Sequence, residues 1–288
     1  MLDISVIIVN WNTYELLRNC LRSIITHTTC TTKYEITVVD NGSTDGSAEM
    51  VARHFPEVRL ICNQNNLGFA KANNQAIKVS TGRYLVLLNS DTELKNDALT
   101  AMMNFMDAHP SAGICGTKLL NADGTRQDSC DLFPRTPYMM LRDKIRDIRR
   151  RRYTNSWQNR MAAWNFDSNF VVDYLIGAAL LIRRETLKQI GMLDARFFMY
   201  AEDIDWCYRA FLKGWQTYYL GTISIYHYNR GSSNKSPELS AQLQTLRRES
   251  LLQFYRKHYG RVNALLLKEY IRFTFPICQK KSLLTKIY

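Results

Sequence analysis

The run Ile4-Ser5-Val6-Ile7-Ile8-Val9 decides the fold class together with the two segments that come after it along the chain. Its β-branched residues are typical of a buried strand. Residues 14–25 then carry leucine and isoleucine at helical spacing, and residues 35–39 form a second apolar run. A strand, a helix and another strand in this order predict a parallel sheet with helices packed on it. We therefore expect an α/β protein.

The same alternation continues to about residue 108. The patterns predict helices at 47–54, 69–79 and 97–108, and strands at 58–62 and 84–88. Loops that follow parallel strands open at one edge of the sheet, where α/β proteins bind their ligands. We therefore expect a binding site in the loops after Val9, Val39, Cys62 and Leu88.

The second half of the chain is less regular. From 124 to 169 the alternation weakens, and we interpret this stretch as an insertion that forms a lid or an acceptor platform. Order returns with a strand at 171–182, a helix ending at Gly191, an acidic helix ending near Lys213, a strand at 217–226, and helices at 237–258 and 262–275. These patterns predict a main domain over residues 1–230 and a C-terminal helical extension over 231–288.

Composition limits where the protein works. The 288 residues include seven cysteines, an odd number without a Cys-x-x-Cys pair, which argues against a disulfide framework and a zinc ribbon. The longest charge-free apolar run, residues 174–182, is too short to cross a bilayer, and no signal-peptide pattern precedes the first strand. We expect a cytoplasmic protein, or one that is peripheral at the inner face of the cell membrane.

The net charge of +12 indicates a polyanionic partner, namely nucleic acid, anionic lipid or a phosphate-bearing substrate. Much of this charge lies in residues 142–152, where Leu141, Ile145 and Ile148 recur at helical spacing. That pattern favours a basic amphipathic helix on an anionic membrane surface, and equally a solvated helix packed through its narrow apolar stripe. Because no nucleic-acid recognition motif accompanies the charge, we do not expect nucleic acid as a partner.

Three carboxylates, Glu202, Asp203 and Asp205, lie among aromatic residues at an expected helix start. Burial beside aromatic rings raises a carboxyl pKa toward neutrality, which suits a proton acceptor. The alternative is an acidic first helical turn that only caps the helix and interacts with its dipole.

Polar residues at the expected strand ends suit a nucleotide. Asp40 follows the second strand, where a carboxylate accepts a hydrogen bond from N3–H of uracil or thymine; the alternative is a simple Asx-turn. Asn66 and Lys71 flank the glycine at the start of the 69–79 helix, an arrangement that suits phosphate or sugar hydroxyls. The chain lacks Gly-x-Gly-x-x-Gly and a P-loop, the motifs typical of dinucleotide sites and of ATP or GTP sites, which argues against both kinds of site.

Two further residues suit a divalent cation. Asp91 follows the fourth strand and offers carboxylate oxygens, while His227 follows the strand at 217–226 and offers an imidazole from the other side. A lone histidine is more often structural than a ligand.

Together these segments resemble the family 2 inverting glycosyltransferases with the GT-A fold, a Rossmann-like, mostly parallel mixed sheet flanked by helices. The resemblance covers about residues 3–230, and its blocks are 5–12, 38–47, 66–74, 88–92, 200–209 and 227–232. Within the family, the segments 65–74 and 88–92 look most like the bacterial rhamnosyltransferase-like branch.

The resemblance implies roles for the matched positions. Asn10 and Asp40 would bind the nucleotide, Asp203 would be the catalytic base, and Asp91 with His227 would hold Mg²⁺ or Mn²⁺. Asn89 stands where the family often has the first aspartate of its metal motif, so the cation depends mainly on the other two residues. We count Asn89 among the substrate-binding residues, together with Asn66, Lys71, Glu202 and Asp205. Of these, Glu202 is expected to contact acceptor hydroxyls and Asp205 also to hold the helix start.

The implied function is inverting transfer of one sugar from dTDP-rhamnose or a UDP-sugar to a hydroxyl of a glycan or lipid-linked saccharide in cell-surface polysaccharide synthesis. The Gln-x-x-Arg-Trp signature of processive synthases is missing, which favours a single addition. One alternative is a non-catalytic GT-A protein that binds carbohydrate or a partner. Another is a nucleotidyltransferase, but that class needs a glycine-rich basic loop where this chain has Asn10-Trp11-Asn12-Thr13.

Overall fold

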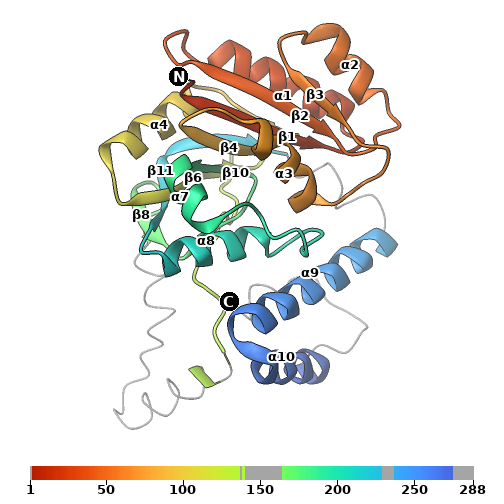
Figure 1. Cartoon of the computed structure of the whole chain (residues 1–288), viewed down its shortest axis with the longest axis vertical. Helices are drawn as coiled ribbons and strands as arrows, with labels where there is room; N and C mark the ends of the chain where they lie inside the picture. Colours follow the sequence, from red (N-terminus) through yellow and green to blue (C-terminus); the bar gives the residue numbers. More distant parts are fainter. Residues whose placement is uncertain (1, 137, 140–163, 229–236, 275–288) are drawn as a thin grey trace.

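The computed structural model describes residues 2–136, 138–139, 164–228 and 237–274 (Figure 1). Most of the expected insertion and all of the basic segment 142–152 lie outside these residues. The expected domain boundary at 230 also lies outside them, so the division into a main domain and an extension stays a prediction.

A mixed sheet with the strand order β3-β2-β1-β4-β10-β6-β11-β5 forms the centre of the molecule, and β8 pairs with β11. Its strands are β1 (Ile4–Asn10), β2 (Tyr34–Asp40), β3 (Arg59–Cys62), β4 (Tyr84–Asn89), β5 (Thr92–Glu93), β6 (Ala112–Leu120), β8 (Asn169–Val172), β10 (Ala179–Arg183) and β11 (Gln216–His227). The first four strands in the order are parallel, whereas β10 is antiparallel to β4 and β6. This confirms the expected mostly parallel sheet.

Helices cover both faces of the sheet. They are α1 (Tyr14–His27), α2 (Ser47–His54), α3 (Phe69–Val79), α4 (Ala98–Ala108), α7 (Arg184–Ile190) and α8 (Glu202–Leu212). Side chains alternate along β1, so Val6 and Ile8 pack with α1, α2 and α4, while Ile7 packs with α3, α7 and α8. Because β1 is buried on both faces, its near-continuous apolar run is what the buried position requires.

Two parts of the sheet differ from the sequence patterns. No strand was expected at β6, where Gly113 and Gly116 interrupt the apolar run; a side chain at Gly116 would lie 2.9 Å from the carbonyl of Ala179 on the neighbouring strand. The single strand expected at 171–182 is instead three strands, β8, β9 (Tyr174–Leu175) and β10. Of these, β9 leaves the main sheet to pair with β7 (Cys130–Asp131).

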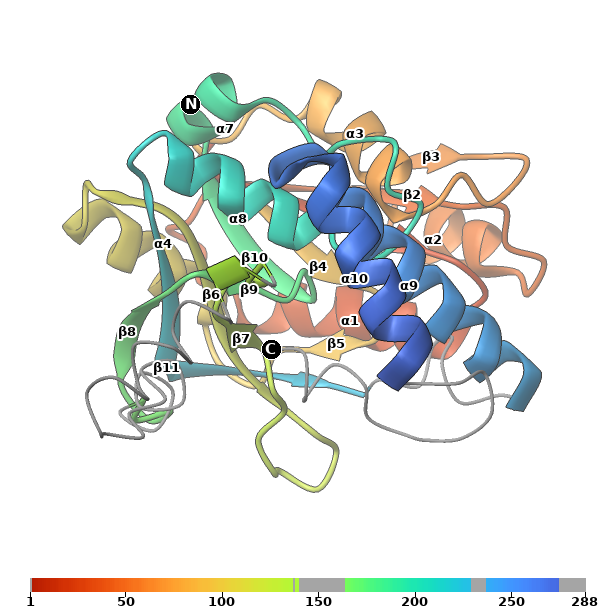
Figure 2. The ribbon, with the colours of Figure 1, turned by 90° about the horizontal axis from the view of Figure 1, so that it is seen from below.

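Two C-terminal helices form a hairpin, α9 (Pro237–His258) and α10 (Gly260–Thr274), joined at Gly260, whose φ is +85°. Figure 2 shows α10 in front of α9 when the molecule is seen from below. Phe254 of α9 and Leu267 of α10 are buried in the same core as Trp206 of α8. Within the described residues, no helix combines the length and apolar character that a membrane span requires.

Candidate active site

The carboxyl ends of β1, β2 and β4 meet at one edge of the sheet, as expected. Asn10 lies opposite Asp40, and Val9 lies opposite Asn89. The Asn10 Nδ2 donates a hydrogen bond to the Asp40 Oδ1 at 3.0 Å, and both side chains are buried. Parallel register therefore orients a carboxylate at this edge without any charged partner.

The loop after β2 holds the Asp40 carboxylate from its other side. The backbone N of Ser43 donates to the Asp40 Oδ2 at 2.9 Å, one residue further along the chain than in the Asx-turn expected as the alternative. Ser43 also accepts, through its Oγ, from the Asn10 Nδ2 and from the backbone N of Asn12, whose φ is +55°. Each oxygen of the Asp40 carboxylate keeps a second lone pair, so these hydrogen bonds are compatible with a contact to a nucleotide base.

Asn41 is a buried residue with several hydrogen-bond partners, and the sequence patterns did not indicate this role. Its Oδ1 accepts from Asn63 Nδ2 at 3.1 Å and from the backbone N of Leu67 at 3.0 Å. Its Nδ2 donates to the Asn66 Oδ1 at 2.8 Å, and that oxygen also accepts from the backbone N of Gly68. The side-chain oxygen of Asn66 is therefore occupied by hydrogen bonds within the loop. The only signal for Asn41 was its position in a cluster of turn-forming residues.

The start of α3 is pressed against the segment that leads into α8. The backbone N of Phe69 donates to the carbonyl of Phe198 at 2.7 Å. Gly68 has a φ of +85°, and a Cβ there would lie only 2.5 Å from that same carbonyl. Further along α3, Asn74 makes two hydrogen bonds to the backbone of Leu193. Lys71, on the first turn, is exposed.

Asp91 and His227 come together although 136 residues separate them. The Asp91 Oδ1 lies 3.2 Å from the His227 Nε2, and both side chains are largely buried. The pairing of β5 with β11 brings this about, because His227 lies opposite Thr92, the residue after Asp91. Asn89 adds its Nδ2 at 3.4 Å from the same Nε2.

Gln127, a residue without any sequence signal, determines which His227 nitrogen carries the proton. The Gln127 Nε2 donates to the His227 carbonyl and to the Asn121 Oδ1, so its Oε1 faces the His227 Nδ1 at 2.8 Å. Nδ1 is then the donor, and in the neutral imidazole Nε2 keeps a lone pair. Two acceptors 3.2 Å apart, this lone pair and the Asp91 carboxylate, favour a cation between them.

The donor set fits a divalent cation of the Mg²⁺ or Mn²⁺ type. Such ions use one or two protein ligands and complete their coordination with water and substrate phosphates. The described part of the chain holds no group of three or more His, Cys, Asp and Glu residues arranged for a metal. Asp91 and His227 would therefore supply part of the coordination, and a diphosphate the rest.

The start of α8 has an unusual backbone. Tyr200 and Ala201 have positive φ values of +71° and +62°. With Asn12, they are the described non-glycine residues whose φ is positive. Such conformations concentrate at functional sites because they cost energy that the surroundings must offset. Glu202, Asp203 and Asp205 follow this unusual backbone, in the first turn of α8.

The Asp203 carboxylate is held by two backbone hydrogen bonds. Its Oδ2 accepts from the backbone N of Gly177 at 3.0 Å and its Oδ1 from the backbone N of Ile204 at 2.8 Å. Burial raises the pKa of Asp203 above its usual range, although these two hydrogen bonds lower it. The result is an oriented carboxylate of increased basicity.

Glu202 differs from its neighbour. It is 5% exposed, and its Oε2 has no hydrogen-bond partner within the described chain. Burial, followed by the negative charges of Asp203 and Asp205, raises the pKa of Glu202 well above its usual range. Of the two adjacent carboxyls, Glu202 is therefore the one whose surroundings favour the protonated form more strongly.

Asp205 belongs to a buried ion-pair network and not to the surface of the site. It is 0% exposed and binds the Arg209 Nε at 2.8 Å, the Lys257 Nζ at 2.5 Å and the His258 Nε2 at 2.7 Å. Burial acts to raise the pKa of Asp205, but the hydrogen bond with His258 and the charges of Arg209 and Lys257 lower it. This fits the expected role at the helix start. Because three nitrogen partners share its two oxygens, we propose that Asp205 serves the fold and not substrate binding.

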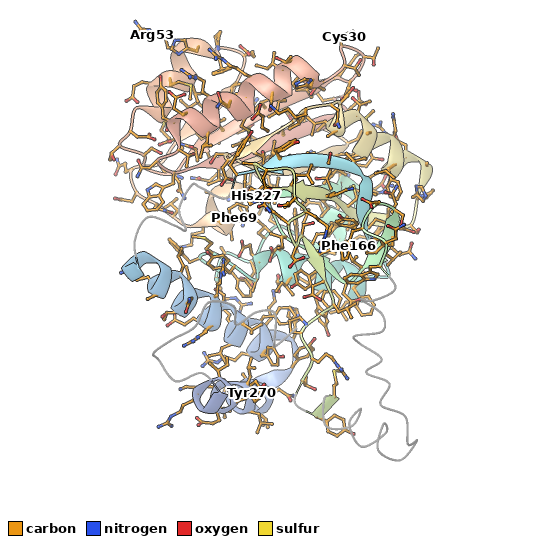
Figure 3. The ribbon with its side chains drawn as sticks, turned by 180° about the vertical axis from the view of Figure 1, so that it is seen from behind. Cys30, Arg53, Phe69, Phe166, His227 and Tyr270 are labelled. Carbon is orange, nitrogen blue, oxygen red and sulfur yellow. The ribbon has the colours of Figure 1, made fainter. Side chains whose placement is uncertain are left out.

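A two-residue bridge joins the strand tips to the start of α8. The backbone N of Asn89 donates to the carbonyl of Ala178 at 2.9 Å, and the preceding residue, Gly177, donates to Asp203. Figure 3 labels His227 at the end of β11 and Phe69 at the start of α3, and a Cβ at Gly177 would lie 3.7 Å from the Cε1 of Phe69. These two contacts link Asn89 at the end of β4 to Asp203 at the start of α8.

Comparisons with known proteins identify the family of this chain. The model of the family described as glycosyl transferase family 2 matches residues 5–209. An N-acetylglucosaminyl-diphospho-decaprenol L-rhamnosyltransferase of Mycobacterium tuberculosis is 26% identical over 219 residues, which cover 70% of this chain and 69% of that protein.

Solved structures resemble the whole described architecture. A mannosyltransferase of Pyrobaculum calidifontis, solved with GDP-Man and Mn²⁺, matches 95% of this chain and 70% of its own with a TM-score of 0.59 and 19% identity. GalNAc-T7, solved with UDP, GalNAc and Mn²⁺, matches 97% of this chain and 59% of its own with a TM-score of 0.59 and 16% identity. These likenesses confirm the expected GT-A fold.

Proposed function

We propose, on the premise that this chain belongs to glycosyl transferase family 2, that it transfers one sugar from a nucleotide-diphosphate donor to an acceptor hydroxyl with inversion at the anomeric carbon. The observation that carries the proposal is the pair at the start of α8. Asp203 there is a carboxylate oriented by two backbone hydrogen bonds and with a raised pKa, beside the buried Glu202, whose pKa is raised further. A cleft that only bound carbohydrate would have no need of this arrangement.

Asp203 would remove the proton of the acceptor hydroxyl. As the bond from that oxygen to the anomeric carbon forms, the bond from the carbon to the diphosphate oxygen breaks on the opposite face, which inverts the configuration. The hydrogen bonds from Gly177 and Ile204 aim the carboxylate, and its raised pKa strengthens it as a base. General-base assistance of this kind contributes about 10²–10⁴-fold to a rate.

Asp91 and His227 would hold Mg²⁺ or Mn²⁺, which when bound neutralises charge on the departing diphosphate. The Gln127 Oε1 accepts a hydrogen bond from the His227 Nδ1, so that in the neutral imidazole Nε2 keeps its lone pair toward Asp91. Asn89 lies beside both, with its Nδ2 3.4 Å from Nε2. The proposed ligand set therefore depends on the Gln127 amide as well as on the ligands.

Asp40, Asn10, Asn66 and Lys71 would bind the nucleotide and the sugar. The buried pair of Asn10 and Asp40 suits the N3–H of a pyrimidine base, which supports dTDP-rhamnose or a UDP-sugar as the donor. Lys71, exposed at the start of α3, suits a phosphate or sugar oxygen, and the half-buried side-chain amide of Asn66 suits a hydroxyl. Glu202, when protonated, would donate to an acceptor hydroxyl.

The similarity to the mycobacterial rhamnosyltransferase supports a role in cell-surface glycan synthesis with a lipid-linked saccharide as acceptor. We propose that the protein works from the cytoplasm at the inner face of the cell membrane. The basic segment 142–152, outside the described residues, remains a candidate membrane contact on the strength of its sequence.

A donor screen tests the function. The full chain is heated with Mn²⁺ and dTDP-rhamnose, UDP-sugars or GDP-sugars, because a ligand that binds the folded state raises its melting temperature. We expect a dTDP- or UDP-sugar to give the largest shift, and metal-dependent release of the nucleotide from that donor. The anomeric configuration of the product, determined by NMR, tests inversion. A protein that binds a donor but never cleaves it, with or without metal, would be the non-catalytic alternative.

A further inference from the structure

Helix α10 presents apolar side chains on two opposite faces. The inner face packs against the core through Ala264, Leu267 and Ile271. The outer face carries Val262, Leu265 and Leu266, whose exposed fractions are 69%, 59% and 50%. A helix that needed only to pack on α9 would carry polar residues at these outer positions. The outer face therefore requires a partner.

A basic edge borders this outer face. Arg261, Lys268 and Arg272 are spaced seven and four residues apart, so they lie in one row along the helix, and all three are exposed. Glu269 is the single acidic residue of α10 and lies 3.7 Å from Arg272. An apolar strip with a basic edge is the pattern of helices that lie in the plane of a membrane interface.

We propose that the outer face of α10, formed by Val262, Leu265 and Leu266 with its basic edge, docks on an anionic lipid surface. Charge complementarity selects this occupant. The chain has a net charge of +12, so a second copy would bring another basic edge against the first, whereas anionic headgroups attract it. The helix would lie on the membrane and not cross it.

Docking would orient the site, because the hairpin is joined to the start of α8. On α9, Ser250 donates from its Oγ to the carbonyl of Met199 at 2.8 Å, and Arg247 lies over the ring of Tyr200 at 4.5 Å. Figure 1 shows α9 and α10 below α8, away from α1 and α2. If the protein is a glycosyltransferase as proposed, a docked α10 would hold the start of α8, with Asp203, at a fixed position relative to the membrane that carries a lipid-linked substrate.

Vesicle co-sedimentation of the full chain tests the docking. We expect binding to phosphatidylcholine vesicles that contain phosphatidylglycerol, weaker binding to phosphatidylcholine alone, and a loss of binding as salt rises. The triple variant Val262→Ser, Leu265→Ser, Leu266→Ser should lower the partition coefficient by about tenfold or more, since binding scales with buried apolar area. The matched control is Phe211→Ser with Leu212→Ser, which removes apolar residues of similar exposure from the end of α8 and should bind like the wild type.

A second variant separates charge from apolar contact. Arg261→Gln with Lys268→Gln and Arg272→Gln should remove most of the preference for anionic over neutral vesicles. Unchanged binding of the triple serine variant would overturn the proposal, as would equal binding to both vesicle types. It would also be overturned by a wild-type dimer in solution that the serine variant converts to monomer. Donor cleavage is measured on the same preparations, so a protein that docks but never cleaves a donor would refute the function and leave the docking intact.

Discussion

The tips of β1 and β2 and the start of α8 both present carboxylates, but they hold them by different means. At the strand tips, regular parallel register places Asn10 opposite Asp40, and neutral donors satisfy the carboxylate. At the start of α8, an irregular backbone places three acids in one turn, where burial and charge raise the pKa of Glu202 and Asp203 and lower that of Asp205. Regular structure suits a group that only binds. A tuned environment suits one that exchanges a proton.

The sharpest test of this contrast is Asp203→Asn, which keeps the shape of the side chain and removes its basicity. We expect the transfer rate to fall by about 10²–10⁴-fold, with the donor-induced thermal shift preserved. Asp167→Asn, a matched change at an exposed acid paired with Lys118, should leave the rate unchanged. An Asp203→Asn enzyme with nearly wild-type transfer would mean that the start of α8 holds no base.

The pH dependence of activity reports the same pKa. Because Asp203 must be ionised to accept a proton and its pKa is raised by burial, activity should rise with pH on an acidic limb that lies above the range of an ordinary aspartate. Measuring kcat/KM against pH for the free enzyme locates this limb. A limb in the ordinary aspartate range would contradict the environment proposed for Asp203.

Asp205, two residues away, should behave in the opposite manner. Asp205→Ala leaves Arg209, Lys257 and His258 gathered around a site that has lost its negative charge, and we expect a loss of about 3–5 kcal/mol in the free energy of unfolding. Denaturant unfolding measures this. Because the folded-state pKa of Asp205 is lowered, its contribution to stability is present above the unfolded-state pKa and is lost as pH falls through the folded-state pKa.

The control for Asp205 is Asp194→Ala, which removes another carboxylate bound to Lys257 but at a position of greater exposure. A smaller loss of stability is expected there. If Asp205→Ala left stability intact and abolished transfer, Asp205 would belong to the substrate site, as its sequence position indicated.

On the cation side, Gln127→Leu should weaken metal binding without touching a ligand. Loss of the amide removes the acceptor that keeps the proton on His227 Nδ1, and changes of this kind cost about 10–100-fold in metal affinity. Mn²⁺ titration followed by electron paramagnetic resonance measures the affinity directly. Gln189→Leu, which removes a glutamine bonded to Trp215 away from the site, is the control. Unchanged Mn²⁺ affinity in Gln127→Leu would show that His227 is not held in this way.

The difference between the two regions also explains what the sequence could predict. The ends of strands have local sequence signals. An apolar run that ends in Asp40 or in Asn89 predicts both the strand and the polar residue at its carboxyl end. The helices at 47–54, 69–79 and 237–258 likewise have local signals and begin and end where expected. The raised pKa at Asp203 was also anticipated, from its aromatic neighbours.

What could not be predicted depends on partners that lie far away in the sequence. Gln127 contacts His227 across 100 residues, and Asp205 meets Lys257 and His258 only because α9 packs on α8. Similarly, the glycines of β6 weaken its apolar pattern, yet they are required by a neighbouring strand that no local pattern reveals. Periodicity reports which face of an element is buried and does not report what covers it.

The smallest expected effect is that of Glu202→Gln. If Glu202 keeps its proton at the working pH, glutamine reproduces both its shape and its charge, so transfer should stay within a few-fold of wild type. Stability should separate the two proteins instead. Because the folded-state pKa of Glu202 is raised, the wild type loses stability as pH rises from the unfolded-state pKa toward the folded-state pKa, and the glutamine variant does not. Melting temperatures compared across that pH window should therefore diverge in favour of the variant, whereas parallel curves would place the Glu202 proton elsewhere.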